Sequence, residues 1–277
     1  MRTIVLFYGF LGYAAFLAAL TYAMGFVSNV AVPRSLDAGG PATPLAFAII
    51  INASLLLLFA VQHTIMARPA FKRWITRFIP SAAERSTFVW AASAALSLAM
   101  WQWRPLGGDL WRVDAQALPW IFALLAATGW GIVLYSSFLV DHWELFGVRQ
   151  VLNYYRNQPD EPRGFVTRSL YKRVRHPLML GFVIAFWATP HMTVSHLLFS
   201  LLVTAYILVG IRFEERDLRK ALGPAYAKYC EKTPMLLPRV TAPIDSIAVV
   251  GSETSAIPRL ASEAIRRHET NWHSRDS

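Results

Sequence analysis

The run from Leu45 to Met66, LAFAIIINASLLLLFAVQHTIM, decides the fold class of this chain. It contains no Asp, Glu, Lys or Arg, and its one histidine, His63, stands near its end. A helix rises about 1.5 Å per residue, so about 20 mostly apolar residues cross the hydrocarbon core of a bilayer. The run therefore predicts a membrane-spanning helix.

Similar apolar runs recur along the chain. The last two are short and are separated only by Thr189-Pro190-His191-Met192-Thr193, which predicts a tight helical hairpin. The sequence thus predicts an all-α integral membrane protein with about six transmembrane helices, four full spans plus the C-terminal hairpin. The predicted spans are 4–27, 45–66, 86–103, 118–140, 178–189 and 195–211.

The composition agrees with a bilayer protein and argues against other classes. Apolar residues make up 55% of the chain and charged residues 16%, whereas soluble domains have about 25% charged residues. The net charge of +10 would suit nucleic acid, but the basic residues lie between apolar runs and not in one patch. We therefore predict the lipid bilayer as a partner and no nucleic acid. The single cysteine, Cys230, excludes an intramolecular disulfide.

Loop charges predict the orientation. The connections 67–85 and 141–177 and the segment after Ile211 are rich in Lys and Arg, whereas 28–44 and 104–117 are nearly balanced. The positive-inside rule then places the basic connections and both termini in the cytoplasm, as in a multi-pass protein of the bacterial inner membrane. After about residue 240 the composition changes to scattered Pro, Ser, Thr, Glu and Arg. This predicts a membrane domain over 1–240 and a disordered cytoplasmic tail over 241–277.

The densest polar residues flank the predicted hairpin. Arg175, His176 and Pro177 stand at its entry, and Glu214 and Glu215 stand just after its exit. Because a tight hairpin brings its two ends together, we expect these side chains to lie close to one another. Ionisable groups at the mouth of an apolar bundle indicate a functional site. The alternative is an ordinary belt of ion pairs at the lipid headgroups.

Four sequence blocks resemble the isoprenylcysteine carboxyl methyltransferase family. They are RHPLMLG (175–181), EERDL (214–218), LGPAYAKY (222–229) and TPMLLP (233–238). Further stretches resemble a narrower group within it, the bacterial membrane methanethiol S-methyltransferases: QHTIMARP (62–69), ERST (84–87), WQWRP (101–105) and DHWELFGVRQ (141–150). The resemblance covers roughly residues 1–240. One departure is Met179, where the family commonly has tyrosine.

The resemblance implies methyl transfer from S-adenosylmethionine to methanethiol, a small volatile thiol, yielding dimethyl sulfide. It implies a cytoplasmic cofactor pocket formed by the hairpin and the segment after it. Two other functions stay open from the residues alone: methylation of a prenylcysteine-like or other lipid acceptor, and a non-enzymatic membrane protein. The cofactor-binding residues implied are Tyr171, Arg175, His176, Pro177, Glu214, Glu215, Tyr226 and Tyr229.

The thiol must react as its thiolate, since the thiol is a poor nucleophile. We predict His63, Asp141 and His142 as substrate-side catalytic residues. The base that takes the thiol proton is left open between His63, His142, His176 and a carboxylate. The structural alternatives are an interfacial histidine capping carbonyls for His63 and a solvated helix end for Asp141 and His142. No metal site is predicted, because adjacent residues such as Asp141 and His142 rarely converge on one ion.

Overall fold

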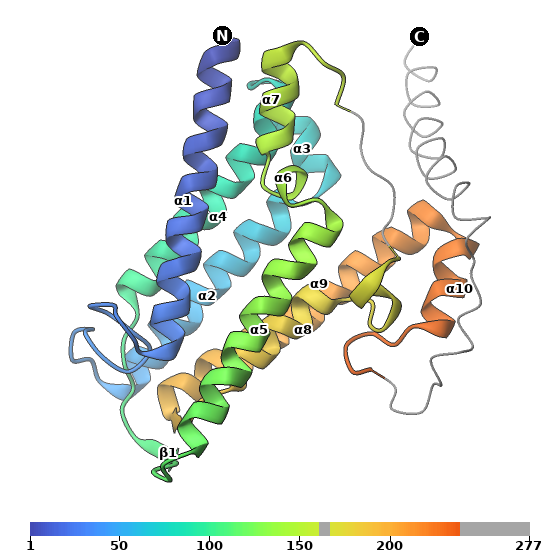
Figure 1. The fold of residues 1–277 in the computed structure, drawn as a ribbon. Coiled ribbons are helices and arrows are strands. Elements are labelled where there is room, and N and C mark those ends of the chain that lie inside the picture. Colours follow the sequence, from blue (N-terminus) through green and yellow to red (C-terminus); the bar gives the residue numbers. More distant parts are fainter. Residues whose placement is uncertain (161–166, 239–277) are drawn as a thin grey trace.

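The computed structural model describes residues 1–160 and 167–238. The predicted tail over 241–277 lies outside the described residues. Figure 1 places the N terminus, α3, α6 and α7 at one end of the bundle and β1 at the other. The elements are α1 (Arg2–Ser28), α2 (Leu45–Met66), α3 (Pro69–Ile75), α4 (Ser81–Gln102), β1 (Asp109–Arg112), α5 (Leu118–Val140), α6 (His142–Leu145), α7 (Val148–Arg156), the 3-10 turn η1 (Ser169–Lys172), α8 (Pro177–Trp187), β2 (His191–Thr193), α9 (Val194–Leu222) and α10 (Pro224–Lys232).

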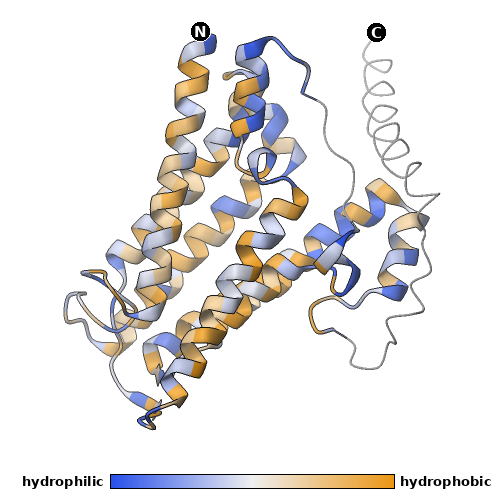
Figure 2. Cartoon of the chain, viewed as in Figure 1, coloured by the Kyte–Doolittle hydropathy of each residue, from blue (hydrophilic) through white to orange (hydrophobic). Residues whose placement is uncertain are grey.

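The described chain is mostly helical, as predicted, and it is a membrane protein. Four helices, α1, α2, α5 and α9, are long and apolar enough to cross a bilayer, and α8 is an apolar helix of 11 residues. The predicted bounds 45–66 and 118–140 match α2 and α5. Figure 2 shows these helices as mainly hydrophobic, whereas α7 and the C-terminal part of α9 carry the hydrophilic residues.

Three elements differ from the sequence prediction. The last span was predicted to end at residue 211, but α9 continues as one helix to Leu222, because no Gly or Pro stands between Ile211 and Gly223. Glu214 and Glu215 therefore lie on a helix. Helix α4 begins at Ser81, after Pro80 and before the predicted residue 86. Strands β1 and β2, which were not predicted, pair antiparallel at the end of the bundle opposite the N terminus.

Neighbouring helices pack in the order α1, α4, α2, α9, α8 and α5. The closest contact joins α5 and α8 at Gly129 and Gly181, where a Cβ atom on Gly129 would lie 2.7 Å from the Gly181 carbonyl oxygen. Gly129 also contacts Ala185, and Val133, one turn further along α5, contacts Gly181. The two helices are therefore antiparallel, so the C-terminal end of α5 lies near the beginning of α8.

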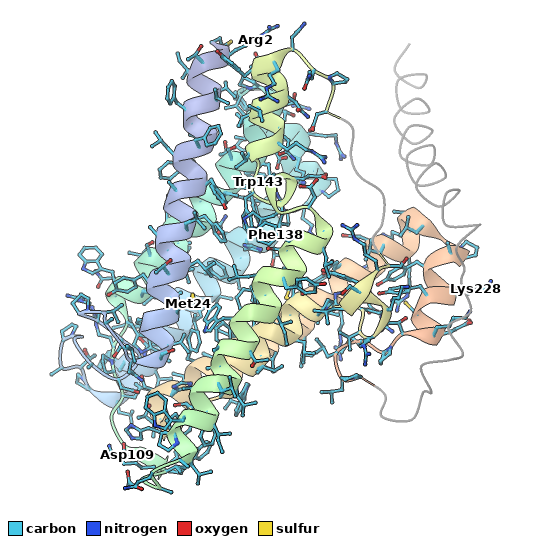
Figure 3. The ribbon with its side chains drawn as sticks, viewed as in Figure 1. Arg2, Met24, Asp109, Phe138, Trp143 and Lys228 are labelled. Atoms are coloured by element: carbon cyan, nitrogen blue, oxygen red, sulfur yellow. The ribbon has the colours of Figure 1, made fainter. Side chains whose placement is uncertain are left out.

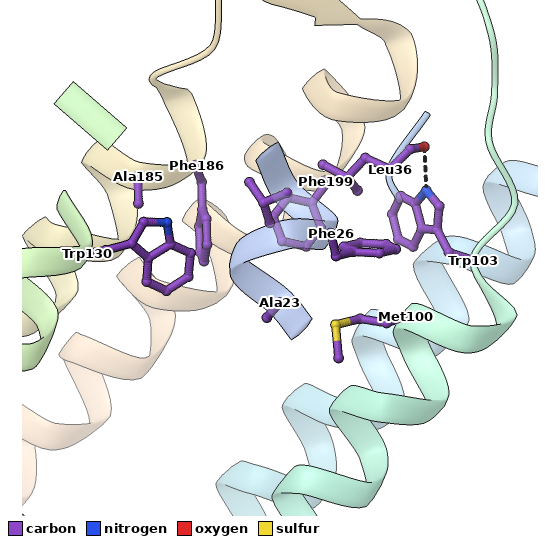
Figure 4. Close-up of a cluster of buried hydrophobic side chains, with 10 residues drawn as sticks. Ala23, Phe26, Leu36, Met100, Trp103, Trp130, Ala185, Phe186 and Phe199 are labelled. Carbon is purple, nitrogen blue, oxygen red and sulfur yellow. Dashed lines mark hydrogen bonds between the residues drawn. The ribbon is translucent and has the colours of Figure 1, made fainter. Parts of the chain in front are cut away.

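The half of the bundle near β1 is filled by aromatic side chains (Figure 4). The rings of Phe26 and Trp103 meet edge to face at 6.0 Å, and Phe199 lies 5.9 Å from Trp103 and 5.2 Å from Phe186. The Trp103 indole N–H donates to the Leu36 carbonyl oxygen at 3.1 Å.

Candidate functional site

The carboxylate of Glu215 is the centre of a buried ionic cluster between α8 and α9. Its Oε1 atom accepts hydrogen bonds from Arg175 Nε at 2.7 Å and His176 Nε2 at 3.2 Å, and its Oε2 atom accepts from Arg219 Nη2 at 2.8 Å. Arg219 lies one helical turn after Glu215, while Pro177 holds His176 at the start of α8. The predicted proximity of Arg175 and His176 to the acidic pair is confirmed.

Arg175 also fastens the C-terminal segment to the beginning of α8. Its Nη1 atom donates to the carbonyl oxygens of Cys230, at 3.2 Å, and Thr233. The backbone N–H groups of Arg175 and His176 donate to the carbonyl oxygens of Pro234 and Met235 at 2.9 and 3.1 Å. Burial lowers the pKa of the Arg175 guanidinium, but the hydrogen bond and charge of Glu215 outweigh it and raise that pKa. Arg175 is therefore always charged in this cluster.

Three tyrosines form a wall beside this cluster. Tyr226 is 1% exposed, and its ring lies 5.9 Å from that of Tyr229. The Tyr229 hydroxyl donates to the Tyr171 carbonyl oxygen at 2.6 Å, which joins α10 to η1. Burial first, and the nearby acidic side chains second, raise the pKa of Tyr171 and Tyr226, and burial raises that of Tyr229. All three are neutral near pH 7.

Glu214 differs from Glu215 although the two are adjacent. Its side chain is 52% exposed, and its Oε2 atom lies 3.6 Å from His176 Nδ1. An open carboxylate between a histidine and aromatic rings is suited to accept hydrogen bonds from a ligand's amine or hydroxyl groups and to attract a cation. Glu215, by contrast, is engaged by two arginines and a histidine.

Asp141 and His142 are buried, so they are not a solvated helix end. Asp141 caps α6 by accepting from the Glu144 N–H at 3.1 Å and pairs with Arg149 at 2.7 Å. Its φ of 114° is a costly conformation for a residue with a side chain, and it turns the chain sharply out of α5. The described contacts of Asp141 thus fix the position of His142.

Both ring nitrogens of His142 are engaged. The Ser137 hydroxyl donates to the Leu134 carbonyl at 2.7 Å, so its oxygen accepts from His142 Nδ1 at 2.8 Å. Nε2 is then the acceptor for the Tyr13 hydroxyl, also at 2.8 Å. Burial lowers the pKa of His142, and the charge of Asp141 offsets this only in part. Phe138 stacks on the imidazole with the ring centres 4.3 Å apart. Figure 3 labels Phe138 near the C-terminal end of α5 and Trp143 on α6.

His63 is placed differently. Its ring is half-buried between Phe59, at 5.3 Å, and Phe88, at 4.7 Å. Within the described part of the chain its Nδ1 atom is buried and has no hydrogen-bond partner. Of the three predicted substrate-side residues, His63 thus has the unengaged ring nitrogen.

One residue near His63 was missed by the sequence analysis. Arg85 is a member of the basic connection 67–85 that set the orientation, and its guanidinium lies over the Phe88 ring at 4.9 Å. Arg85 belongs to the block ERST (84–87) that resembles the family, and this block could have pointed to it. It was missed because an arginine in a loop beside a predicted span is already explained by the positive-inside rule.

Comparisons with known proteins show the family of this chain. The family model described as NnrU protein matches residues 51–251. The chain belongs to the NnrU protein family. This NnrU-family chain is 48% identical over 241 residues to methanethiol S-methyltransferase 2 of Bradyrhizobium diazoefficiens, covering 87% of this chain and 92% of that protein.

Two further relatives extend the comparison. Methanethiol S-methyltransferase of Mycobacterium tuberculosis is 50% identical over 237 residues, which cover 86% of the NnrU-family chain and 97% of the relative. Nurim of Mus musculus is 32% identical over 177 residues, 60% of this chain and 66% of that protein. No solved structure matches the chain. The predicted resemblance to bacterial membrane methanethiol S-methyltransferases is confirmed.

Proposed function

We propose that this protein is a membrane methyltransferase that moves a methyl group from S-adenosylmethionine to methanethiol, yielding dimethyl sulfide and S-adenosylhomocysteine. The observation that carries the proposal is the 48–50% identity to two proteins named methanethiol S-methyltransferase over nearly their whole length. The buried cluster around Glu215 supports the proposal.

The residues at the end of α9 fit S-adenosylmethionine. When bound, this cofactor supplies a methyl group made electrophilic by a sulfonium centre. The open carboxylate of Glu214 suits its cationic and hydroxyl groups, while the partly buried Tyr171 and Tyr229 offer aromatic faces for the adenosine. The buried Tyr226 packs beside Tyr229. His176 and Pro177 shape the entrance at the start of α8. Arg175 and Glu215 hold this frame together.

Methyl transfer is an in-line displacement, so alignment of the thiol with the methyl group is the main contribution of the protein. The second requirement is removal of the thiol proton as the new bond forms. His63, Asp141 and His142 are the candidate groups for that step. The hydrogen bonds that engage Asp141 and His142 favour His63.

Labelled cofactor tests the reaction directly. Purified protein in detergent, given S-adenosylmethionine with a labelled methyl group and methanethiol, should release labelled dimethyl sulfide. Prenylcysteine analogues in parallel should not be methylated. Methylation of the analogues alone would reject methanethiol as the acceptor, and cofactor binding without any methylation would reject the reaction.

Calorimetric titration with S-adenosylhomocysteine tests the cofactor site. Glu214→Gln removes the open carboxylate and should weaken binding about tenfold, the loss of one charge-assisted hydrogen bond. Glu231→Gln, an exposed acid on α10, is the matched control and should bind like the natural protein. Equal affinities for the two variants would place the cofactor elsewhere.

For the membrane arrangement we propose six spans, with α4 and α8 crossing beside the four long helices and with both termini in the cytoplasm of a bacterial inner membrane. The domain over 1–240 is the methyltransferase unit. The basic connections 67–85 and 141–177 support this orientation. A membrane-impermeant maleimide should label Cys230 only in opened cells, and Asp114→Cys, with Cys230→Ser, in intact cells. The reverse pattern would invert the topology.

A further inference from the structure

The guanidinium of Arg85 forms no ion pair with a carboxylate of the described residues. Its Nε atom donates to the Leu145 carbonyl oxygen at 2.7 Å, but no carboxylate of residues 1–160 or 167–238 lies within 4.0 Å of its guanidinium. The nearest acids in sequence and space have other partners: Glu84 lies 4.0 Å from Lys72, and Glu144 pairs with Arg149 at 2.6 Å. A half-buried cation without a counter-charge is a place for an anionic ligand group.

His63 lies beside this cation. The imidazole and the guanidinium both approach the ring of Phe88, at 4.7 and 4.9 Å, so α2 and α4 bring a base and a cation together. The charge of Arg85 is close enough to act on the imidazole. His63 Nδ1 is buried without a partner among the described residues, which leaves it able to accept a proton.

Other buried polar atoms near the same ends of α2, α4 and α7 also lack partners within the described ranges. They include Gln62 Oε1, Gln150 Oε1 and Ser86 Oγ. Ser86 is 0% exposed, and its hydroxyl lies 2.9 Å from where a Cβ atom on Gly147 would stand. Because folded proteins pair more than about nine in ten buried polar groups, this concentration marks a place where ligand or water atoms complete the hydrogen bonds.

We propose that Arg85 and His63 form the thiol-activating site of this enzyme, an inference that rests on the proposed function. His63 Nδ1 takes the proton as the S–H bond of methanethiol breaks, and the guanidinium of Arg85 stabilises the negative charge on sulfur. That sulfur forms its bond to the methyl group while the carbon–sulfonium bond breaks, and the sulfonium sulfur keeps the electron pair. Arg85 is thus a catalytic residue and not only a topology signal.

The physical basis is the acidity of the thiol. A neighbouring guanidinium lowers the pKa of a thiol by stabilising the thiolate, and a positioned general base contributes about 10²–10⁴-fold to such reactions. Arg85 lies near the N-terminal end of α4, which begins at Ser81, and its guanidinium lies 4.9 Å from the centre of the Phe88 ring.

Rate–pH profiles of variants test the pair. At pH 7, His63→Gln should lower kcat/KM for methanethiol about 10²-fold or more, and the deficit should narrow as the pH rises because solution thiolate replaces the lost base. Arg85→Gln should lower it about 10²-fold and move the profile to higher pH, while Arg85→Lys recovers part of the loss. Arg77→Gln, an exposed arginine of the same connection, is the matched control.

Calorimetry with S-adenosylhomocysteine separates this inference from the proposed function. All of these variants should bind S-adenosylhomocysteine with the affinity of the natural protein, because His63 and Arg85 act on the thiol and not on the cofactor. Unchanged kcat/KM in His63→Gln and Arg85→Gln would overturn the inference and leave the proposed function intact. A loss of kcat/KM that does not change with pH and is accompanied by lost cofactor affinity would do the same. A natural protein that binds the cofactor but methylates no thiol would reject both proposals.

Discussion

The two polar regions of the bundle, around Glu215 and around Arg85, differ in how many of their polar groups have partners within the described protein. Around Glu215, each charge has its counter-charge, and Arg175 is bonded to a side chain and two carbonyl oxygens. Around Arg85, a cation and a histidine nitrogen have no such partners in the described chain. A satisfied buried network fixes geometry, whereas an unsatisfied one leaves bonds for a ligand to make. We infer that the first region builds the cofactor pocket and the second carries out the thiol chemistry.

Among the changes that test this comparison, removal of the Glu215 carboxylate should have the largest effect on stability and cofactor affinity. Glu215→Ala leaves Arg175 without its counter-charge and His176 Nε2 without its hydrogen-bond partner, a change that costs about 3–5 kcal/mol. S-adenosylhomocysteine affinity should then fall about 10²-fold or more in calorimetry, with membrane insertion intact. Asp217→Ala, which breaks only the exposed pair with Arg68, should change affinity little. Full affinity in Glu215→Ala would show that the network is not part of the pocket.

The close contact between α5 and α8 gives the next effect. In Gly129→Ala the new methyl group meets backbone atoms of Gly181 and Ala185 at 2.6–2.7 Å, so α5 and α8 must move apart, at a cost of about 1–3 kcal/mol. Thermal unfolding in detergent should show a lower Tm. Gly131→Ala, where the added methyl group meets no described atom within 4 Å, is the control and should keep or raise the Tm. Equal Tm values would mean that the close helix contact is not required.

A smaller effect separates the two candidate bases His63 and His142. Tyr13→Phe removes the hydroxyl that bonds His142 Nε2 and should cost about 1 kcal/mol of stability. Methyl transfer should remain nearly unchanged, in contrast to the large loss expected for His63→Gln. Activity measurements on both variants decide between the histidines. A severe loss of rate in Tyr13→Phe at unchanged Tm would make His142 the base.

The smallest expected effect is a pH dependence of stability. Burial lowers the pKa of His142 in the folded protein, so the unfolded chain binds its proton more readily. The stability that this neutral imidazole contributes is present above the ordinary pKa of about 6.5 and is lost as the pH falls through the lower folded value. The Tm of the natural protein should therefore fall more between pH 7 and 5 than that of His142→Gln. Parallel curves would contradict the assigned hydrogen bonds.

Much of the fold could be predicted because bilayer helices are selected by local composition. The bounds 45–66 and 118–140 agree with the structure, since uninterrupted apolar runs leave no alternative to helix in a bilayer. The extension of α9 to Leu222 was missed because high hydropathy marks only the part of a helix inside the membrane, whereas the helix itself continues into polar residues. The pairing of β1 with β2 was missed because strands this short carry no periodic signal.

The candidate site, too, could be predicted only in part from the sequence. The nearness of His176 to Glu215 followed from a hairpin whose two ends must meet, and the structure shows it. The difference between Glu214 and Glu215 did not follow, because adjacent residues of a helix point in different directions and only the packing of α8 and α10 determines which one is buried.

By itself, the sequence determined that this protein is helical, membrane-embedded and equipped with an Arg-His-Pro and Glu-Glu pair, because hydrophobicity and residue order are local properties. Only the tertiary structure decided which charges are neutralised. Whether Arg85 has a counter-charge depends on α2, α4, α6 and α7 meeting at one end of the bundle, and a linear pattern does not contain those distances.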